Sequence, residues 1–138
     1  MFKSLTYVSR SMLTSSRRGA ELEAILTFSR ARNGVVGVTG ALISSFYTFA
    51  QLIEGPDSSI EVLMASINRD GRHRDVKVIS VKNTTRRIFP NWSMAYSGNA
   101  NYIDRHIEIL LDPSNPEANR RPVEQLESLI EEFSKRLN

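Results

Sequence analysis

Two polar side chains that can form hydrogen bonds lie in segments whose patterns predict strands. Gln51 lies inside the apolar stretch 49–53, directly before the turn sequence at 54–56, and Tyr7 lies within the stretch 2–9. The first stretch has the composition of a buried strand, and residues 2–9 alternate well enough for a strand, with Leu5, Tyr7 and Ser9 on one face. A buried primary amide costs a few kcal/mol unless its donors and its acceptor find partners. We therefore expect a polar partner for Gln51 in the interior, either another side chain or a bound ligand.

Other residue types give little support for catalysis or metal binding. The chain contains no cysteine, which excludes disulfides, thiolate metal sites and cysteine nucleophiles within it. Its two histidines, His73 and His106, lack metal-ligand spacing to each other or to a carboxylate cluster. The glycines of 34–40 match neither the phosphate-loop nor the dinucleotide-binding fingerprint. We therefore expect a binding or sensing protein and not an enzyme.

Composition narrows the class further. The 138 residues carry a net charge of +3 and are 41% hydrophobic, as in one globular domain. The arginines are dispersed among acidic residues, without the basic stripe and interleaved aromatic residues of a nucleic-acid-binding surface. The N-terminus resembles neither a signal peptide nor an anchor, and no apolar run approaches the roughly 20 residues that span a bilayer. We expect a cytoplasmic protein that binds neither nucleic acid nor membrane.

Hydrophobic periodicity predicts the order β-α-β-β-α-β-β over residues 2–97. Strands are expected at 2–9, 38–44, 48–54, 76–82 and 93–97. Helices are expected at 17–32 and after the turn 55–57, the second ending at the stop signal 69–71. Residues 14–16 offer N-caps for the first helix, and Asn33-Gly34 offers a left-handed stop. This order favours an α+β, ferredoxin-like fold, in which a mixed sheet carries both helices on one face. Strands one and three can be neighbours there, which would place Tyr7 beside Gln51.

The C-terminal residues have a different pattern. Residues 101–111 and 123–137 each place apolar side chains at helical spacing, and the sequence Asp-Pro-Ser-Asn-Pro at 112–116 separates them. We expect a two-helix cap on the sheet face that the first two helices leave bare. The alternative is that the last helix also docks on a partner or on a second subunit. The predicted division is a domain over 1–98 and a cap or output segment over 99–138.

Six segments in order carry a resemblance to a known family. They are 5–9 (LTYVS), 25–33 (ILTFSRARN), 37–42 (GVTGAL), 49–55 (FAQLIEG), 67–73 (INRDGRH) and 89–94 (FPNWSM). Together, over about residues 2–97, they resemble the BLUF family of blue-light sensors that use FAD. The resemblance implies a ferredoxin-like domain that holds the flavin ring between its two helices, above the sheet.

The resemblance also implies roles for individual residues. Tyr7 matches the tyrosine that donates an electron and then a proton to excited flavin, and Gln51 matches the amide that bridges this tyrosine and the ring. Asn33 matches the amide that binds the other polar edge of the ring. The remaining matches are apolar ring contacts (Ile25, Phe49, Ile67), wall positions linked to output (Ser9, Trp92, Met94) and the D-x-R-H stretch (Asp70, Arg72, His73). The chain departs from the family at Arg32, where an asparagine or histidine is common; an arginine there can stack on an aromatic face.

A flavin site without cysteine cannot form a cysteinyl–flavin adduct and must switch by electron transfer and hydrogen-bond rearrangement. An amide suits this because rotation or tautomerism exchanges its donor and acceptor without changing charge or volume. We expect a FAD-binding photoreceptor that signals through its C-terminal segment to a downstream effector, with homo-oligomers plausible. The alternative is a light-insensitive flavin or small-ligand module on the same fold. An RNA-binding protein of this fold would need exposed aromatic and basic residues on the central strands, where this chain has apolar runs and Gln51. A small hydrolase of this fold would need an anion-binding loop or a general base, which the sequence does not offer.

Overall fold

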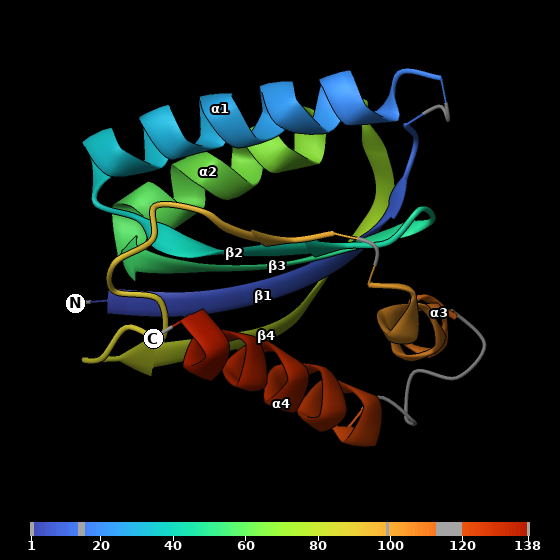
Figure 1. The fold of residues 1–138 in the computed structure, drawn as a ribbon. Coiled ribbons are helices and arrows are strands. Elements are labelled where there is room, and N and C mark those ends of the chain that lie inside the picture. The colour runs from blue at the N-terminus through green and yellow to red at the C-terminus, as the bar shows by residue number, and fades with distance from the viewer. Residues whose placement is uncertain (1, 14–15, 99, 113–119, 138) are drawn as a thin grey trace.

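Five strands form one mixed sheet in the order β4-β1-β3-β2-β5 (Figure 1). The structure is a computed structural model that describes residues 2–13, 16–98, 100–112 and 120–137. The strands are β1 (Phe2–Ser11), β2 (Thr39–Ser44), β3 (Thr48–Pro56), β4 (His73–Thr84) and β5 (Ala95–Ser97). Neighbouring strands run antiparallel except β2 and β5, which pair in parallel. The predicted βαββαββ order and ferredoxin-like sheet are therefore confirmed.

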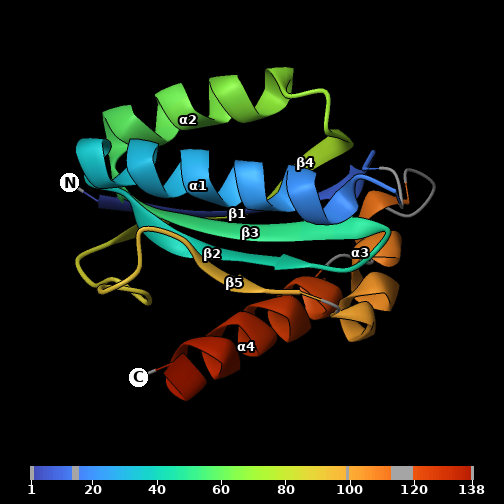
Figure 2. The same cartoon turned by 45° about the horizontal axis from the view of Figure 1, so that its top comes forward.

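Helices cover both faces of this sheet. The α1 helix (Arg18–Val36) and the α2 helix (Asp57–Arg69) lie on one face, and α3 (Asp104–Leu111), preceded by the short η1 (Asn101–Ile103), and α4 (Arg120–Leu137) lie on the other (Figure 1). Figure 2 shows α1 and α2 side by side above the strands. Each face has its own cluster of buried apolar side chains. The predicted position of the C-terminal helices is confirmed.

Alternation along β3 decides which side chains reach which face, since successive strand residues point to opposite sides. Phe49 and Ile53 pack in the cluster beneath α1 and α2, whereas Ala50 and Leu52 pack in the cluster against α3 and α4. Gln51 shares the face of Phe49 and Ile53. The register pairs Tyr7 of β1 with Gln51, so the predicted neighbourhood of the two residues is confirmed.

The first helix differs from its predicted bounds at both ends. It continues past Asn33-Gly34 to Val36, and Gly37 provides the left-handed conformation with φ of 72°. The predicted stop is wrong because the Asn33 side chain is buried and bonded elsewhere, which leaves its backbone helical. At the start, Arg17 occupies the cap position and its side chain makes no capping hydrogen bond. Residues 14 and 15, predicted as caps, lie outside the described residues.

Six strand ends also differ from the prediction. β2 begins at Thr39, β3 ends at Pro56 and β4 ends at Thr84, each one or two residues from the predicted bound. β1 extends to Ser11 and β4 begins at His73, because the two strands pair over almost their whole lengths with irregularities in register. β5 begins at Ala95 and not at residue 93, because its ladder with β2 starts at Ala41 and Ala95. Most of the predicted breaker at 112–116 lies outside the described residues. Within the described ranges, none of the helices combines the length and apolar character that a membrane span requires.

Gly40 allows β2 to approach β3 closely, which gives a test of the packing that supports the site. A Cβ at position 40 would overlap the backbone carbonyl oxygen of Leu52. We predict that Gly40→Ala lowers the free energy of unfolding by about 1–3 kcal/mol or more, since backbone cannot yield as a side-chain end does. Urea denaturation at a fixed protein concentration measures this.

Gly34→Ala is the matched control, because a Cβ there meets nothing within 4 Å and the residue is in the helix α1. Its stability should stay equal or rise by up to about 1 kcal/mol, as for a helix-interior glycine. An unchanged unfolding midpoint for Gly40→Ala would contradict the packing described.

Candidate functional site

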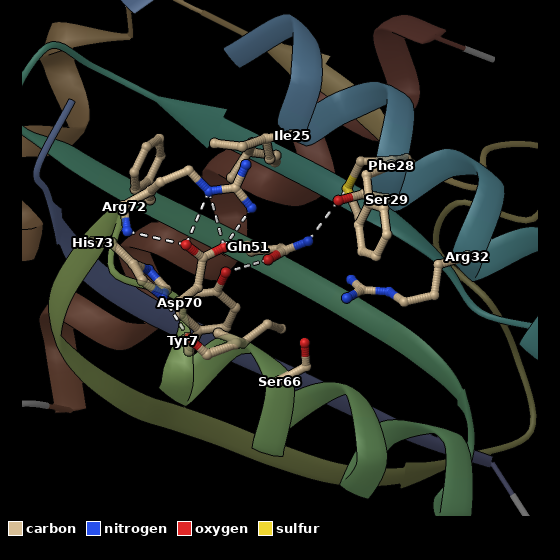
Figure 3. A pocket seen from close by; sticks show the side chains of 14 residues that line it. Tyr7, Ile25, Phe28, Ser29, Arg32, Gln51, Ser66, Asp70, Arg72 and His73 are labelled. Carbon is tan, nitrogen blue, oxygen red and sulfur yellow. Dashed lines mark hydrogen bonds and ion pairs between the residues drawn. The ribbon is translucent and has the colours of Figure 1, made fainter. Parts of the chain in front are cut away.

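A cavity lies between α1 and α2, above β1 and β3 (Figure 3). About 660 Å³ within the cavity and in the open solvent at its mouth is free of protein atoms. Ten of the residues singled out in the sequence line it: Tyr7, Ile25, Arg32, Phe49, Gln51, Ile67, Asp70, Arg72, His73 and Met94. Ser9, Asn33 and Trp92 do not. The fold therefore brings residues from five separate segments to one cavity.

The polar centre of the cavity is a chain of three side chains. The Tyr7 hydroxyl donates to Gln51 Oε1, and Gln51 Nε2 lies 3.4 Å from Met94 Sδ. A thioether has no hydrogen to donate, so the NH₂ end of the amide must face Met94. The carbonyl end must then face Tyr7, and the hydroxyl must be the donor. The orientation of Gln51 thus follows from the chemistry of its two partners.

Burial keeps the Tyr7 phenol neutral. Desolvation raises the pKa of Tyr7 well above its ordinary value; the charge of Asp70 raises it further, and that of Arg32 opposes the rise. A neutral phenol retains the proton that it donates to Gln51. The hydrogen bond between the two residues therefore persists through neutral pH and well into the alkaline range.

Charged residues form one side of the cavity. The Arg72 guanidinium binds both carboxylate oxygens of Asp70, with Nη2 2.6 Å from Oδ2. These hydrogen bonds are the main reason that the pKa of the Asp70 carboxyl lies below its usual value. Arg32 reaches in from α1, with its guanidinium carbon 5.2 Å from the centre of the Phe28 ring (Figure 3). Burial lowers the pKa of Arg32 from that of a free arginine.

His73 connects the end of α2 with β1. Its Nε2 lies 2.7 Å from the carbonyl oxygen of Ile67, and its Nδ1 lies 2.8 Å from Ser9 Oγ. A carbonyl only accepts, so Nε2 carries the hydrogen; in the neutral ring, Nδ1 must accept the Ser9 hydroxyl hydrogen. Ser9 is thus placed behind the cavity wall, where it orients a residue that lines the cavity.

The predicted wall residues Trp92 and Met94 occupy different environments. Met94 is 1% exposed and lines the cavity, whereas Trp92 is 37% exposed and lies outside it. Asn33 is fully buried in α1, where its Nδ2 donates to the carbonyl oxygen of Ser93 over 2.9 Å. It therefore contacts the segment that carries Met94, although it does not line the cavity.

Comparison with known proteins identifies the family to which this cavity belongs. The family model described as "Sensors of blue-light using FAD" (BLUF) matches residues 2–95. The chain belongs to the BLUF family. The family binds FAD, and the match includes every residue that lines the cavity.

Individual relatives extend the BLUF comparison. "Photoactivated adenylate cyclase subunit beta" of Euglena gracilis is 32% identical over 91 residues, which cover 65% of this chain and 10% of that protein. The chain thus spans about a tenth of the length of this curated relative. The solved structure "BlrB - a BLUF protein, dark state structure" superposes with a TM-score of 0.70 and 32% identity, covering 88% of this chain and 94% of that chain. The solved structure of a bacterial light-regulated adenylyl cyclase superposes with a TM-score of 0.67 and 25% identity. The superposition covers 99% of this chain and 36% of that chain.

The residues present fit a flavin on independent grounds. Arg32, which lines the cavity, carries a buried Nε without a hydrogen-bond partner among the described residues, and such an atom is costly unless a ligand satisfies it. Ile25, Phe49 and Ile67 give the cavity apolar walls. A ring system with apolar faces and polar edges, such as a flavin, matches this combination of apolar walls and an unpartnered donor.

Sequence reasoning missed four residues that line the cavity: Phe28, Ser29, Leu42 and Ser66. Helical spacing from Ile25 could have found two of them, since positions 28 and 29 follow it by three and four residues and share its face. Register could have found Leu42, which pairs with Gln51. No such signal marks Ser66, because it lies beside the buried stripe of α2 and not on it.

We predict that Tyr7 stays protonated at a pH at which an exposed tyrosine is largely ionised. The phenol pKa is raised, so the neutral form is retained as pH rises through about 10 to 11. The raised value also means that the folded state loses stability above the unfolded pKa of about 10. In FAD-loaded protein with ¹³C-labelled tyrosine, the Tyr7 ring signal should not shift with pH in this interval.

The Tyr7→Phe variant assigns that signal, because it removes one of the four tyrosines. A Tyr7 signal that titrates with a midpoint near 10 would contradict the burial and hydrogen bonding described.

Proposed function

We propose that this chain is a blue-light sensor in which FAD binds noncovalently in the cavity and the Gln51 amide acts as the switch. The observation that carries this proposal is the buried chain from the Tyr7 hydroxyl through Gln51 to Met94 Sδ. When bound, flavin supplies the blue-light-absorbing group and, once excited, the electron acceptor. Tyr7 would be the electron donor and would then release its phenolic proton.

Among the described residues, the only hydrogen-bonded acceptor for the Tyr7 proton is Gln51 Oε1. An amide that takes part in this transfer can rotate or tautomerise, and it then presents a donor where it presented an acceptor. Once Tyr7 is again a neutral phenol, the hydrogen bonds of Gln51 on both sides would have been exchanged. The net product is a rearranged set of hydrogen bonds with no change in charge.

The energies involved suit a reversible switch. A net hydrogen bond contributes about 0.5–1.5 kcal/mol, and burial of all three side chains strengthens it. Such an energy biases a two-state element several-fold. We propose accordingly that the chain senses light and acts through an effector, and that cyclase activity belongs to the longer relatives.

The output route that we propose runs from Met94 to the C-terminal helices. Phe89, in the segment before Met94, is fully buried on the opposite face of the sheet, with its ring 5.9 Å from that of Phe133 in α4. Glu54, a buried carboxylate of β3, accepts hydrogen bonds from the backbone N–H groups of Ile88 and Phe89 at 2.8 and 2.7 Å. The segment 88–94 therefore contacts the photoactive amide at one end and α4 at the other.

In this scheme residues 2–95 sense light and α3 and α4 deliver the output. The effector would bind on or through these helices. A homo-oligomer and a cytoplasmic location remain predictions from the sequence. The alternative is a light-insensitive flavin or small-ligand module on the same fold, and it predicts no response of a bound flavin to light.

We predict that the purified protein is yellow and that blue light shifts its absorption spectrum slightly to longer wavelength, reversibly in the dark. Gln51→Leu should retain FAD and lose the shift entirely, because leucine has no hydrogen bonds to exchange. Tyr7→Phe should lose it as well, because it removes the donor hydroxyl. Absorption spectra before and after illumination measure both. Ser66→Ala, which alters the cavity wall away from the hydrogen-bonded chain, is the control and should keep the shift.

A preparation that cannot be loaded with FAD would overturn the photoreceptor proposal. A spectral shift of normal size in Gln51→Leu would overturn only the role of the amide. FAD-loaded wild type without any light response would favour the light-insensitive module.

The output route predicts that Phe133→Ala separates sensing from signalling. The flavin spectral shift should remain, because position 133 lies on the sheet face opposite the cavity. The light-induced change in hydrogen exchange of α4 amides, expected in the wild type, should be lost. Hydrogen-exchange mass spectrometry in darkness and under blue light measures this, with Phe46→Ala, an exposed aromatic truncation, as control. A light-dependent exchange pattern like that of the wild type would contradict the route.

A further inference from the structure

Residues 92–94 directly precede β5, and hydrogen-bond donors from other elements bind their backbone. Each of its three successive carbonyl oxygens accepts a hydrogen bond, although the ladder between β5 and β2 begins only at residue 95. The donors are the Gly40 N–H to Trp92 (3.1 Å), Asn33 Nδ2 to Ser93 (2.9 Å) and Arg30 Nε to Met94 (3.1 Å). Two of the three donors are side chains of α1.

Arg30 and Asn33 are three residues apart and therefore share one face of the helix. They differ in surroundings. Asn33 is fully buried, whereas Arg30 is exposed and does not line the cavity. Changing Asn33 would disturb the interior, but changing Arg30 removes one contact at the surface. A substitution of Arg30 therefore tests the hydrogen bond to the Met94 carbonyl without disturbing the interior.

The contact of Arg30 bears directly on the photoactive amide. It binds the backbone of Met94, and the Met94 side chain is the partner of Gln51 Nε2. Met94 lies just before the first residue of β5, so the sheet ladder does not fix its carbonyl. The position of Sδ against the amide thus depends on donors from α1.

We propose that Arg30 is a positioning residue that keeps Met94 against Gln51 in the dark. The inference deepens the proposed function, on which it rests, by naming a residue outside the cavity that regulates the switch. Arg30 acts through the Met94 backbone and touches neither the cavity nor the amide. A single hydrogen bond of this kind shifts a two-state population by roughly two- to tenfold, which is enough to change the dark arrangement without unfolding the site.

The test is a methionine-methyl NMR spectrum of the FAD-loaded full chain, recorded in darkness. The chain has four methionines, and Met94→Leu assigns the signal of Met94. In Arg30→Ala the Met94 signal should move or split, with a second conformer at least twofold more populated than in the wild type. Fluorescence of Trp92, the sole tryptophan, should change in the same sample, because Trp92 lies two residues before the released Met94 carbonyl.

Arg105→Ala is the matched control, since it removes an exposed helical arginine on the opposite side of the sheet. Its Met94 signal should superimpose on that of the wild type. The same superposition for Arg30→Ala would overturn the proposal. Loss of FAD by Arg30→Ala with the fold intact would also overturn it, because the residue would then belong to the flavin site. The NMR spectra and FAD binding are both measured in darkness. A failure of the photoreceptor proposal would instead appear as a missing light-induced shift in the flavin spectrum, so the two failures can be distinguished.

Discussion

The hydrogen bond between the Tyr7 hydroxyl and the Gln51 carbonyl is the interaction on which the rest of the site depends. A primary amide in an apolar interior must be satisfied at both ends. Tyr7 satisfies the carbonyl end and Met94 faces the NH₂ end. Because the thioether can only accept, these two partners allow one orientation of the amide. An amide held in one orientation by two partners acts as a switch if light can exchange those hydrogen bonds, as the proposed function requires.

The sheet provides the precision that this contact requires. Antiparallel pairing of β1 and β3 places Tyr7 and Gln51 opposite one another, and a slip of one residue would send Gln51 to the face of α3 and α4. Buried apolar residues on both faces prevent such a slip, since every side chain of β3 would exchange its surroundings. The same alternation separates two tasks: one face holds the ligand cavity, and the other holds the C-terminal helices.

Sequence patterns predicted what depends on local periodicity. Apolar spacing and turn residues predicted the order of helices and strands along the chain and the cap on the second face, and the fold class that this order favours predicted that Tyr7 can lie beside Gln51. They missed features set by side-chain contacts with distant backbone. α1 runs past Asn33 and β5 starts late because residues 93 and 94 bond to α1, about 60 positions earlier in the chain. No local pattern encodes such contacts. The outward position of Trp92 and the inward position of Met94 follow from the same contacts.

The central claim, that light exchanges the hydrogen bonds of Gln51, is tested most directly by infrared difference spectroscopy. FAD-loaded protein carrying ¹³C at the side-chain carbonyl of glutamine isolates this group, and Gln51→Leu identifies its band. We predict a light-minus-dark signal in which the Gln51 carbonyl band loses intensity at its dark frequency and appears at a new one, reversing in the dark. A flavin spectrum that shifts with light while the Gln51 carbonyl band stays unchanged would contradict the account.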